Sequence, residues 1–336
     1  MKIGIDLGGT KIEAIVLSET GGLIWRHRTP TPQGNYQKTL AAISLLVTKA
    51  RTENKIAATV SVGIGTPGAM TLPSNTEPSN TVSSFTELVM KNCNSTALNG
   101  QPLLKDLTEL LNCPVYIAND ANCFALAEAL SGQGKRETGQ GQKQSGQGQE
   151  ILVGRTLESV FGVILGTGVG GGIVTNGKLL QGLNSISGEW GHNGLPSAVL
   201  ALLPDSEKSR PCYCGRQDCI ETYLSGPGLA LSYRLRFNEA VNSESVIQKM
   251  RAGEAKAEEI WLSYLSQLGC ALAQVVNILD PALIVLGGGL SSIDEIYLTL
   301  HDLMQPFVFS DTFDTPVLPA LLGDSAGVYG AAWLNS

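Results

Sequence analysis

Residues 2–17 read KIGIDLGGTKIEAIVL, an apolar run, a glycine pair and a second apolar run. We predict two β-strands joined by a tight turn at Gly8 and Gly9, because β-branched residues favour strands and glycine favours turns. The same order returns in residues 159–175, SVFGVILGTGVGGGIVT, where the predicted glycine turn covers residues 166–172. The chain is therefore expected to consist of two related halves, each opening on a strand, a glycine turn and a strand.

The remaining segments alternate between strand and helix patterns, which predicts an α/β fold. Further predicted strands cover residues 23–29, 59–64, 115–118 and 283–286, and predicted helices cover 36–53, 123–131, 258–279 and 327–334. Residues 71–101, rich in Asn, Ser, Thr and Pro, are interpreted as a loop excursion. Residues 132–149 are nearly all Gly, Gln, Lys, Ser and Glu. This low-complexity stretch is predicted to be a mobile surface loop, because it has little apolar surface to bury.

Size and charge limit the function classes. A chain of 336 residues predicts two domains or one large one, and its net charge of −7 argues against nucleic-acid binding. No run approaches the roughly twenty apolar residues of a membrane-spanning helix. The first strand begins at Lys2, and its apolar run is too short for a signal peptide. We therefore expect a cytoplasmic protein with no membrane partner.

Three of the seven cysteines form a cluster, Cys212-x-Cys214-x₄-Cys219. A cytoplasmic location disfavours disulfides, and this short spacing suits a tetrahedral zinc ion. The alternative is three loop cysteines without a metal. The other cysteines are scattered and are interpreted as packing residues; they are Cys93, Cys113, Cys123 and Cys270.

The fourth zinc ligand has to come from one of three histidines. His192 precedes the cysteines closely, whereas His27 and His301 fall in a predicted strand and helix, where packed or solvated histidines are the ordinary case. With four protein ligands the zinc would be structural and would not activate water. Glu189 and Glu221 flank the ligands, so the metal would hold two carboxylates rigidly enough to grip a polyol.

The first glycine turn has the residue types of a phosphate site. Gly8 and Gly9 let backbone N–H groups approach phosphate oxygens, and Thr10 and Lys11 add a hydroxyl and a positive charge. Asp6, at the end of the first strand, is the candidate magnesium ligand, through water. The alternative is an ordinary hairpin turn. The segment is neither a P-loop nor a dinucleotide fingerprint, because a second strand follows the turn.

The second half offers a matching set of glycines. The turn after residue 165 repeats the phosphate-sized geometry, and the glycines after residue 286 form a flat backbone wall for a nucleotide or, alternatively, a close helix contact. The predicted ATP-binding residues of this half are Gly166, Thr167, Gly168, Gly170, Gly287 and Gly288.

Asn119 and Asp120 follow a buried strand and begin a helix, which is where open α/β sheets place ligands. Asp120 is the candidate general base that accepts the proton of an attacking hydroxyl, an effect typically contributing ~10²–10⁴ in rate. The alternative is a simple helix cap.

Taken together, these motifs resemble the ROK family (repressors, open reading frames, kinases) over essentially the whole chain, apart from the low-complexity stretch and part of residues 71–93. The motifs are Asp6–Lys11 (DLGGTK), Asn119–Asn122 (NDAN), Gly166–Gly168 (GTG), Glu189–His192 (EWGH) and Cys212–Glu221 (CYCGRQDCIE). Five stretches look most like the bacterial fructokinase (manno(fructo)kinase) branch: Asn94–Pro102, Pro211–Gly215, Val276–Pro281, Phe307–Phe309 and Gly323–Ser325. In the first of these, Ala97 stands where that branch has tryptophan.

The resemblance implies an actin-like ATPase (ribonuclease H-like) fold, with two similar α/β domains around a cleft. The implied domains are residues 1–118 with about 322–336, and residues 119–321, which include the zinc site and the loop 132–149. A homodimer is also implied.

For the site, the resemblance implies that Asp120 is the catalytic base and that His192 binds zinc through one ring nitrogen and the sugar through the other. The implied sugar-binding residues are Gly68, Asn99, Asn119, Asp120, Glu189, His192 and Glu221. The implied cofactors are structural zinc and magnesium with ATP.

The resulting hypothesis is an ATP-dependent fructokinase acting on the 6-hydroxyl, with mannose or glucose as secondary substrates. The alternative is an N-acetylglucosamine or N-acetylmannosamine kinase. A repressor of the same family would carry a helix-turn-helix ahead of the first strand, and none is expected here. A sugar sensor without catalysis is disfavoured by the presence of Asp120 and both glycine turns.

Overall fold

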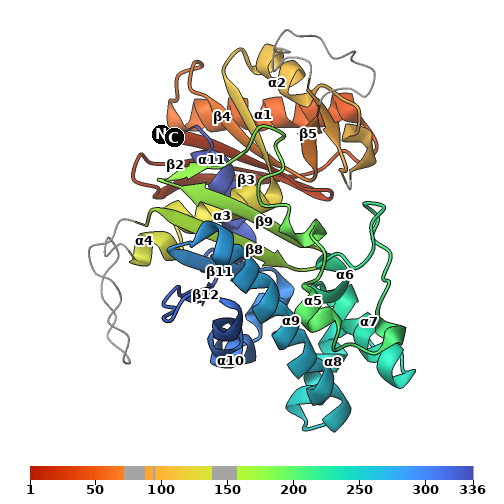
Figure 1. Cartoon of the computed structure of the whole chain (residues 1–336). Helices are drawn as coiled ribbons and strands as arrows, with labels where there is room; N and C mark the ends of the chain where they lie inside the picture. Colours follow the sequence, from red (N-terminus) through yellow and green to blue (C-terminus); the bar gives the residue numbers. More distant parts are fainter. Residues whose placement is uncertain (72–87, 94, 138–156, 336) are drawn as a thin grey trace, which may run out of the picture. The chain divides into compact units, whose positions relative to one another are not determined.

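The computed structural model describes residues 1–71, 88–93, 95–137 and 157–335, and these form two compact α/β units (Figure 1). The first unit comprises Met1–Arg155, Gly172–Ser187 and Leu322–Ser336. The second comprises Thr156–Gly171 and Gly188–Leu321. The α/β class predicted from the sequence is confirmed, whereas the predicted domain boundaries stay a prediction.

A mixed five-stranded sheet, in the order β3-β2-β1-β4-β7, forms the base of the first unit. Its strands are β1 (Lys2–Leu7), β2 (Lys11–Leu17), β3 (Leu23–Pro30), β4 (Val62–Thr66) and β7 (Val115–Asn119). β2 pairs antiparallel with β1 and β3, whereas β4 pairs parallel with β1 and β7. The carboxyl ends of β1, β4 and β7 therefore share one edge, where α/β sheets bind ligands.

Helices cover both faces of this sheet (Figure 1). α1 (Tyr36–Asn54) and α2 (Leu103–Leu111) bury one face, against Ile3, Ile5 and Leu7 of β1 among others. α3 (Asp120–Leu130) and α11 (Ala326–Trp333) lie on the other face. The alternation along β1 follows from the two-residue period of a strand.

Glycines allow α11 to approach the sheet backbone directly. A Cβ at Gly63 in β4 would lie 1.7 Å from the carbonyl oxygen of Ala331. A Cβ at Gly330 would lie 1.7 Å from the carbonyl oxygen of Cys123 in α3. The C-terminal helix thus joins β4 and α3 in one packed block, and this block fixes where α3 begins.

The second sheet runs in the order β10-β9-β8-β11-β12. Its strands are β8 (Ser159–Leu165), β9 (Val169–Thr175), β10 (Lys178–Leu179), β11 (Leu283–Gly287) and β12 (Val317–Pro319). β11 pairs parallel with both β8 and β12. β8 and β9 are neighbours, as the repeat of the first strand–turn–strand unit predicts.

Six helices belong to the second unit: α5 (Ser197–Leu200), α6 (Glu221–Leu224), α7 (Gly226–Phe237), α8 (Ser243–Arg251), α9 (Ala255–Leu279) and α10 (Glu295–Met304). α9 is long and apolar enough to cross a membrane by composition alone, but 56% of its most apolar window is buried inside the protein. Its buried residues include Trp261, Tyr264 and Leu268, so it packs as a core helix.

Several predicted boundaries need correction. The strand predicted at residues 59–64 is Val62–Thr66, and the helix predicted from residue 123 begins at Asp120. The glycine turn predicted over residues 166–172 ends at Gly168, because β9 already begins at Val169. No helix was predicted where α2, α7 and α8 lie.

The two predicted loops are described only in part. Residues 71–101 contain the strand β6 (Val89–Lys91), which pairs antiparallel with β5 (Ala69–Thr71) just before them, and a 3₁₀ turn at Thr96–Leu98. Within residues 132–149, Gln133–Glu137 form the short helix α4, which corrects the loop prediction there. The rest of that prediction lies outside the described residues.

Candidate active site

Asp6 and Asp120 both lie at the carboxyl edge of the first sheet. Asp6 is opposite Gly65 in the pairing of β1 with β4, and Thr66 is opposite Asn119 in the pairing of β4 with β7. These registers bring the ends of the three parallel strands level with each other. The two predicted functional aspartates are therefore neighbours at one edge of the first unit.

Asn119 fixes the start of α3 and so the position of Asp120. The Asn119 side chain caps the helix, since its Oδ1 accepts a hydrogen bond from the backbone N–H of Asn122 at 2.8 Å. Asp120 is the first helical residue, and its Oδ1 accepts the N–H of Ala121 at 2.8 Å. Asn119 rather than Asp120 is therefore the cap of α3.

The electrostatic surroundings of these carboxylates favour their neutral forms. Burial raises the pKa of Asp6 to about 6, and the charges of Glu13 and Asp120 add to the shift. Desolvation by surrounding protein atoms also raises the pKa of Asp120, although backbone hydrogen bonds oppose the shift. Asp120 is nevertheless exposed at the surface of its unit. A raised pKa suits a group that has to accept a proton.

The first glycine turn is exposed, and hydrogen bonds within the turn and from Thr31 fix its shape. The N–H of Gly8 donates to the carbonyl of Lys11 at 3.0 Å, which closes the turn. Thr31, the residue after β3, holds the turn in place: its hydroxyl donates to the carbonyl of Gly8 at 2.7 Å and its N–H donates to the carbonyl of Thr10 at 3.0 Å. Gly9, Thr10 and Lys11 are exposed, so they are accessible to a ligand.

Gly68 and Asn99 lie in the same unit as Asp120. Gly68 has a φ of 87°, and a Cβ there would lie 2.4 Å from the carbonyl of Lys91, so only glycine fits. The Asn99 amide holds the backbone of Cys93, accepting its N–H at 2.8 Å and donating to its carbonyl at 3.2 Å. Asn99 therefore shapes the segment beside β6.

The second glycine turn is bound directly by Glu221. The N–H of Gly166 donates to the carbonyl of Gly168 at 3.0 Å, which closes this turn as Gly8 closes the first. Glu221 Oε2 accepts the N–H of Val169 at 2.9 Å, and a Cβ at Gly168 would lie 2.6 Å from the same oxygen. Gly170, which was predicted to bind phosphate as part of the turn, lies instead in strand β9.

A cavity of about 440 Å³ opens beside this turn in the second unit. Gly166 and Thr167 form one wall, and residues 289–293 form another where the chain leaves β11. Gly288 has a φ of 84°, and its backbone packs so closely on Leu165 that a Cβ would be 2.5 Å from that carbonyl. The predicted glycine wall therefore positions the chain, while Gly289 contacts the cavity.

The polar wall of this cavity comes from α8, which the sequence analysis missed. Ser243, Glu244, Gln248 and Arg251 line it. Arg251 is fixed by two hydrogen bonds to the carboxylate of Glu295, at 2.6 and 2.8 Å. The polar spacing of these residues along one helical face was the available signal, but charged helix faces are usually just solvated.

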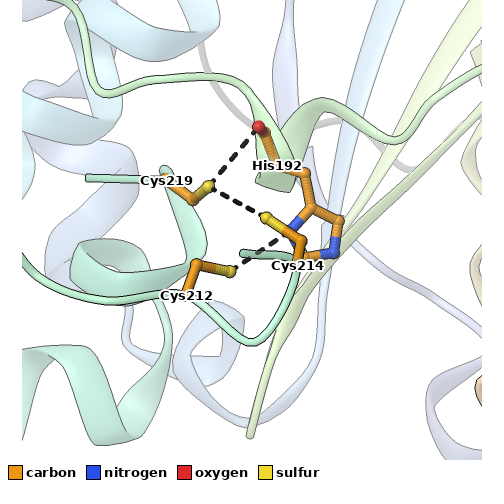
Figure 2. Close-up of side chains that lie close together, drawn as sticks. All are labelled: His192, Cys212, Cys214 and Cys219. Atoms are coloured by element: carbon orange, nitrogen blue, oxygen red, sulfur yellow. Dashed lines mark hydrogen bonds between the residues drawn. The ribbon is translucent and has the colours of Figure 1, made fainter. Parts of the chain in front are cut away.

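His192 and the three cysteines of the cluster converge on one point (Figure 2). Their ligand atoms all lie within 4.8 Å of one another, and this is the one such group of three or more candidate ligands in the described part of the chain. His192 Nδ1 is 3.5 Å from Cys212 Sγ, and Cys214 Sγ is 3.6 Å from Cys219 Sγ.

These separations fit a tetrahedral zinc ion. Zinc–sulfur bonds of about 2.3 Å place two sulfurs about 3.8 Å apart, and a nitrogen ligand lies about 3.6 Å from each sulfur. A backbone hydrogen bond from Arg216, aided by its side chain, lowers the pKa of Cys214 to about 6, which favours the thiolate that a metal binds. With four protein ligands there is no open position, so the centre would be structural.

Trp190 anchors the segment that carries Glu189 and His192. Its indole N–H donates to the carbonyl of Gly170 at 3.0 Å, and its ring meets Phe161 edge-on with centroids 5.7 Å apart. A Cβ at Gly191 would lie 2.1 Å from the carbonyl of Val169, so the segment runs against the start of β9. Glu189 and His192 are therefore held on the same strand end that Glu221 binds.

Arg210 is a second residue that the sequence analysis missed. It is 3% exposed and lies over the Tyr223 ring, 4.0 Å from its centroid. Its backbone N–H donates to Asp218 at 2.9 Å, and its guanidinium donates to the carbonyls of Glu207 and Thr222, each at 2.9 Å. Arg210 thus hydrogen-bonds to the chain both before and after the cysteine loop, at Glu207 and Thr222.

The predicted site residues therefore form two sets, each described within its own unit. The first unit contains Asp6, the turn at Gly8, Gly68, Asn99 and Asp120. The second contains the turn at Gly166, the glycines after β11, the metal cluster, Glu189 and Glu221. The scattered cysteines, Cys93, Cys113, Cys123 and Cys270, are all buried, as expected of packing residues.

Comparison with known proteins gives matches over the full length. The sequence profile of the ROK family matches residues 2–139 and 149–336. An N-acetyl-D-glucosamine kinase of Pectobacterium atrosepticum is 36% identical over 335 residues, covering 100% of this chain and 99% of the relative. One of Yersinia pseudotuberculosis is 37% identical with the same coverage.

Among solved structures, the ROK hexokinase of Thermus thermophilus is similar, with a TM-score of 0.76 and 27% identity over 99% of this chain and 97% of that chain. A ROK family glucokinase of Streptomyces griseus, solved with glucose and AMPPNP, has a TM-score of 0.62 and 25% identity over 98% and 97% of the two chains. These similarities confirm the expected actin-like ATPase fold.

Proposed function

This chain belongs to the ROK family and is a sugar kinase, and we propose that its substrate is N-acetyl-D-glucosamine, phosphorylated by ATP on the 6-hydroxyl. The observation that carries this proposal is the end-to-end similarity to N-acetyl-D-glucosamine kinases, 36–37% identical over 335 residues. The fructokinase prediction from five short stretches is not supported by these relatives, whereas the alternative stated beside it is.

In the proposed mechanism, Asp120 accepts the proton of the sugar hydroxyl as that oxygen attacks the γ-phosphorus. Its position in the first turn of α3, with Asn119 as the cap, gives the carboxylate a fixed direction. Its raised pKa increases its basicity toward the hydroxyl. Proton acceptance of this kind contributes ~10²–10⁴ in rate, and the remainder comes from positioning and charge stabilisation.

The two glycine turns are assigned to the phosphates. Each presents backbone N–H groups from a closed turn between two neighbouring strands, beginning at Gly8 and at Gly166. Lys11 supplies a positive charge at the first turn. Asp6 would hold a magnesium ion through water, and that ion would neutralise charge on the phosphates. The cavity lined by Thr167 and α8 is the proposed place of the nucleoside.

The metal cluster is assigned a bracing role. Zinc held by His192, Cys212, Cys214 and Cys219 would fix the loop on which Glu221 follows directly. Glu221 in turn bridges the metal loop and the phosphate turn through its bond to Val169. Glu189, His192 and Glu221 are then the proposed sugar ligands of the second unit, and Gly68, Asn99 and Asn119 those of the first.

Fructose is kept as a second candidate because of one observation. The stretches Asn94–Pro102, Pro211–Gly215 and Val276–Pro281 look most like the fructokinase branch, and the first of them contains the proposed sugar ligand Asn99. Ala97 departs from that branch, where tryptophan is the expected residue. A cytoplasmic location and a homodimer also remain predictions.

A coupled ADP-release assay across N-acetylglucosamine, fructose, mannose, glucose and N-acetylmannosamine tests this proposal. We expect kcat/KM for N-acetylglucosamine to exceed the others by at least about tenfold, a difference of about 1.4 kcal/mol in transition-state binding. A higher value for fructose would instead establish the second candidate. If no sugar stimulates ADP release, the chain is not a hexose kinase.

A further inference from the structure

The two ring nitrogens of His192 have different partners. Nδ1 points into the cysteine cluster, 3.5 Å from Cys212 Sγ (Figure 2). Nε2 lies 2.9 Å from the hydroxyl oxygen of Tyr213, and the two rings meet edge-on with centroids 5.0 Å apart. The nitrogen that faces away from the metal cluster is therefore hydrogen-bonded to Tyr213.

Metal binding at Nδ1 decides what Nε2 can do. An imidazole that coordinates a metal through Nδ1 is neutral and carries its one proton on Nε2. That N–H is a single donor, and it lies in the plane of the ring. The Tyr213 hydroxyl oxygen must then accept the hydrogen bond that this N–H donates. A sugar oxygen that contacts His192 Nε2 needs the same proton, so the two partners exclude each other.

The Tyr213 side chain is placed so that it can rotate away from His192. Its side chain is 75% exposed, although its backbone lies between two cysteine ligands. The loop around it is closed by its own hydrogen bonds, from Cys212 N–H to Arg216 at 2.9 Å and from Gly215 N–H to Cys212 at 3.0 Å. The aromatic ring can therefore rotate away while the metal loop keeps its shape.

Tyr213 lies in the same unit as Glu189 and Glu221, the two carboxylates assigned to the sugar. Its hydroxyl reaches the third second-unit group assigned to the sugar, since its oxygen is 2.9 Å from His192 Nε2.

We propose that Tyr213 is a positioning residue whose hydroxyl occupies the sugar's place on His192 Nε2 in the sugar-free protein. It keeps the imidazole oriented, and the sugar displaces it on binding, so Tyr213 sets the sugar affinity. This proposal rests on the proposed function, because it requires that a sugar binds at His192.

Calorimetric titration of the zinc-loaded protein with N-acetylglucosamine, and separately with fructose, tests the competition. Tyr213→Phe keeps the ring and removes only the hydroxyl. The sugar Kd of this variant should fall by about 2- to 10-fold, the range that corresponds to one net hydrogen bond. Tyr116→Phe, the same change at an exposed tyrosine of β7, should leave the Kd unchanged. An unchanged or higher Kd for Tyr213→Phe overturns the proposal.

A second measurement needs no sugar. The chain has three histidines, so ¹⁵N-histidine labelling gives a spectrum in which a His192→Gln variant assigns the His192 signals. Tyr213→Phe should shift the His192 Nε2–H resonance and leave those of His27 and His301 in place, and zinc content should stay at the wild-type level. An unshifted resonance overturns the proposed contact. If the wild type binds neither sugar, the proposed function fails, while this spectrum still decides whether Tyr213 holds His192.

Discussion

At the scale of single residues, Asp6 is the clearest case of a functional group that lowers the stability of the fold. Its carboxyl group lies where burial and the charges of Glu13 and Asp120 all oppose ionisation, and they raise its pKa to about 6. The positive charge of Lys11 offsets only part of this rise in the pKa of Asp6. A carboxyl group whose ionised form is disfavoured in the folded protein lowers the free energy of unfolding at neutral pH. Stability therefore does not explain an aspartate at position 6. In the proposed function, its role is to hold the magnesium that accompanies ATP.

Asp6→Asn should therefore stabilise the protein while abolishing turnover. Because the folded pKa is raised, stability decreases as pH rises from about the unfolded value of 3.8 through about 6. The amide removes this loss, so the free energy of unfolding at pH 7 should rise by up to about 3 kcal/mol, with no difference near pH 3. Denaturant unfolding at both pH values, in magnesium-free buffer, measures this.

The matched control is Asp311→Asn, which makes the same change at an exposed carboxyl. It should leave both stability and turnover near those of the wild type. A destabilised Asp6→Asn variant at pH 7 would show that the Asp6 carboxylate supports the fold, and the account of its raised pKa would then be wrong.

Residue chemistry explains which site residues could be predicted. Cys212, Cys214 and Cys219 carry their chemistry in their identity and spacing, and the structure brings them together with His192. Arg210 and Tyr213 acquire their roles only from what folding places beside them. No local pattern distinguishes a buried arginine that ties a loop from a solvated one, and no pattern shows which hydroxyl reaches His192.

At the scale of elements, close helix–sheet packing fixes the edge where Asp120 lies. α11 contacts β4 at Gly63 and α3 through Gly330, and a Cβ at either glycine would clash with the backbone of the neighbouring element. A change that separates these elements would therefore move the beginning of α3 away from the ends of β1 and β4.

Gly63→Ala should be strongly destabilising, because its Cβ would lie 1.7 Å from the Ala331 carbonyl oxygen. The clash involves backbone on both sides, so the expected loss is about 3 kcal/mol or more in the free energy of unfolding. Gly22→Ala is the control, since its Cβ would meet only the Ser18 hydroxyl, at 3.2 Å. It should change stability by less than about 0.5 kcal/mol. Equal stability of the two variants in denaturant unfolding would contradict this packing.

The cysteine loop is the second element with a direct test. Elemental analysis of protein purified without chelators should find one zinc per chain. A strong chelator should lower the melting temperature and weaken sugar binding, and added zinc should restore both, because one ion held by His192, Cys212, Cys214 and Cys219 would cross-link two segments of the chain. Protein that has no zinc and yet binds sugar normally would contradict the bracing role.

Element prediction succeeded where the pattern is local and failed where tertiary contacts decide. β1, β2 and β8 follow from their apolar runs and glycine turns. The sequence of α7 has hardly any one-sided pattern, because Leu231 and Leu235 lie on the face opposite the buried Leu229 and Tyr233, and so the helix escaped prediction. The end of the second turn was misjudged for a related reason. The glycine run suggested a turn, but neighbouring backbone and side chains leave no room for a Cβ at Gly171 or Gly172 within β9.

At the scale of the whole molecule, the repeated strand–turn–strand unit predicted two related α/β halves, and the resemblance to the ROK family added the actin-like ATPase fold. Two such units explain the two related halves, and the similarity to the Thermus thermophilus ROK hexokinase extends over 99% of the chain. The choice of sugar is a different matter, because it depends on a few contacts worth about 1–3 kcal/mol each. Short stretches around Asn99 and Cys212 favoured fructose, whereas similarity over the whole chain favours N-acetylglucosamine.

The central claim is phosphoryl transfer from ATP to a sugar 6-hydroxyl with Asp120 as the base. The direct measurement is ³¹P NMR of a reaction containing magnesium ATP and N-acetylglucosamine, with Asp120→Asn run in parallel. The account predicts one 6-phosphomonoester per ADP with the wild type. It predicts a rate lower by ~10²–10⁴ for Asp120→Asn, with calorimetric sugar binding retained. Inorganic phosphate without sugar phosphate, a 1-phosphate product, or an Asp120→Asn rate near that of the wild type would contradict it.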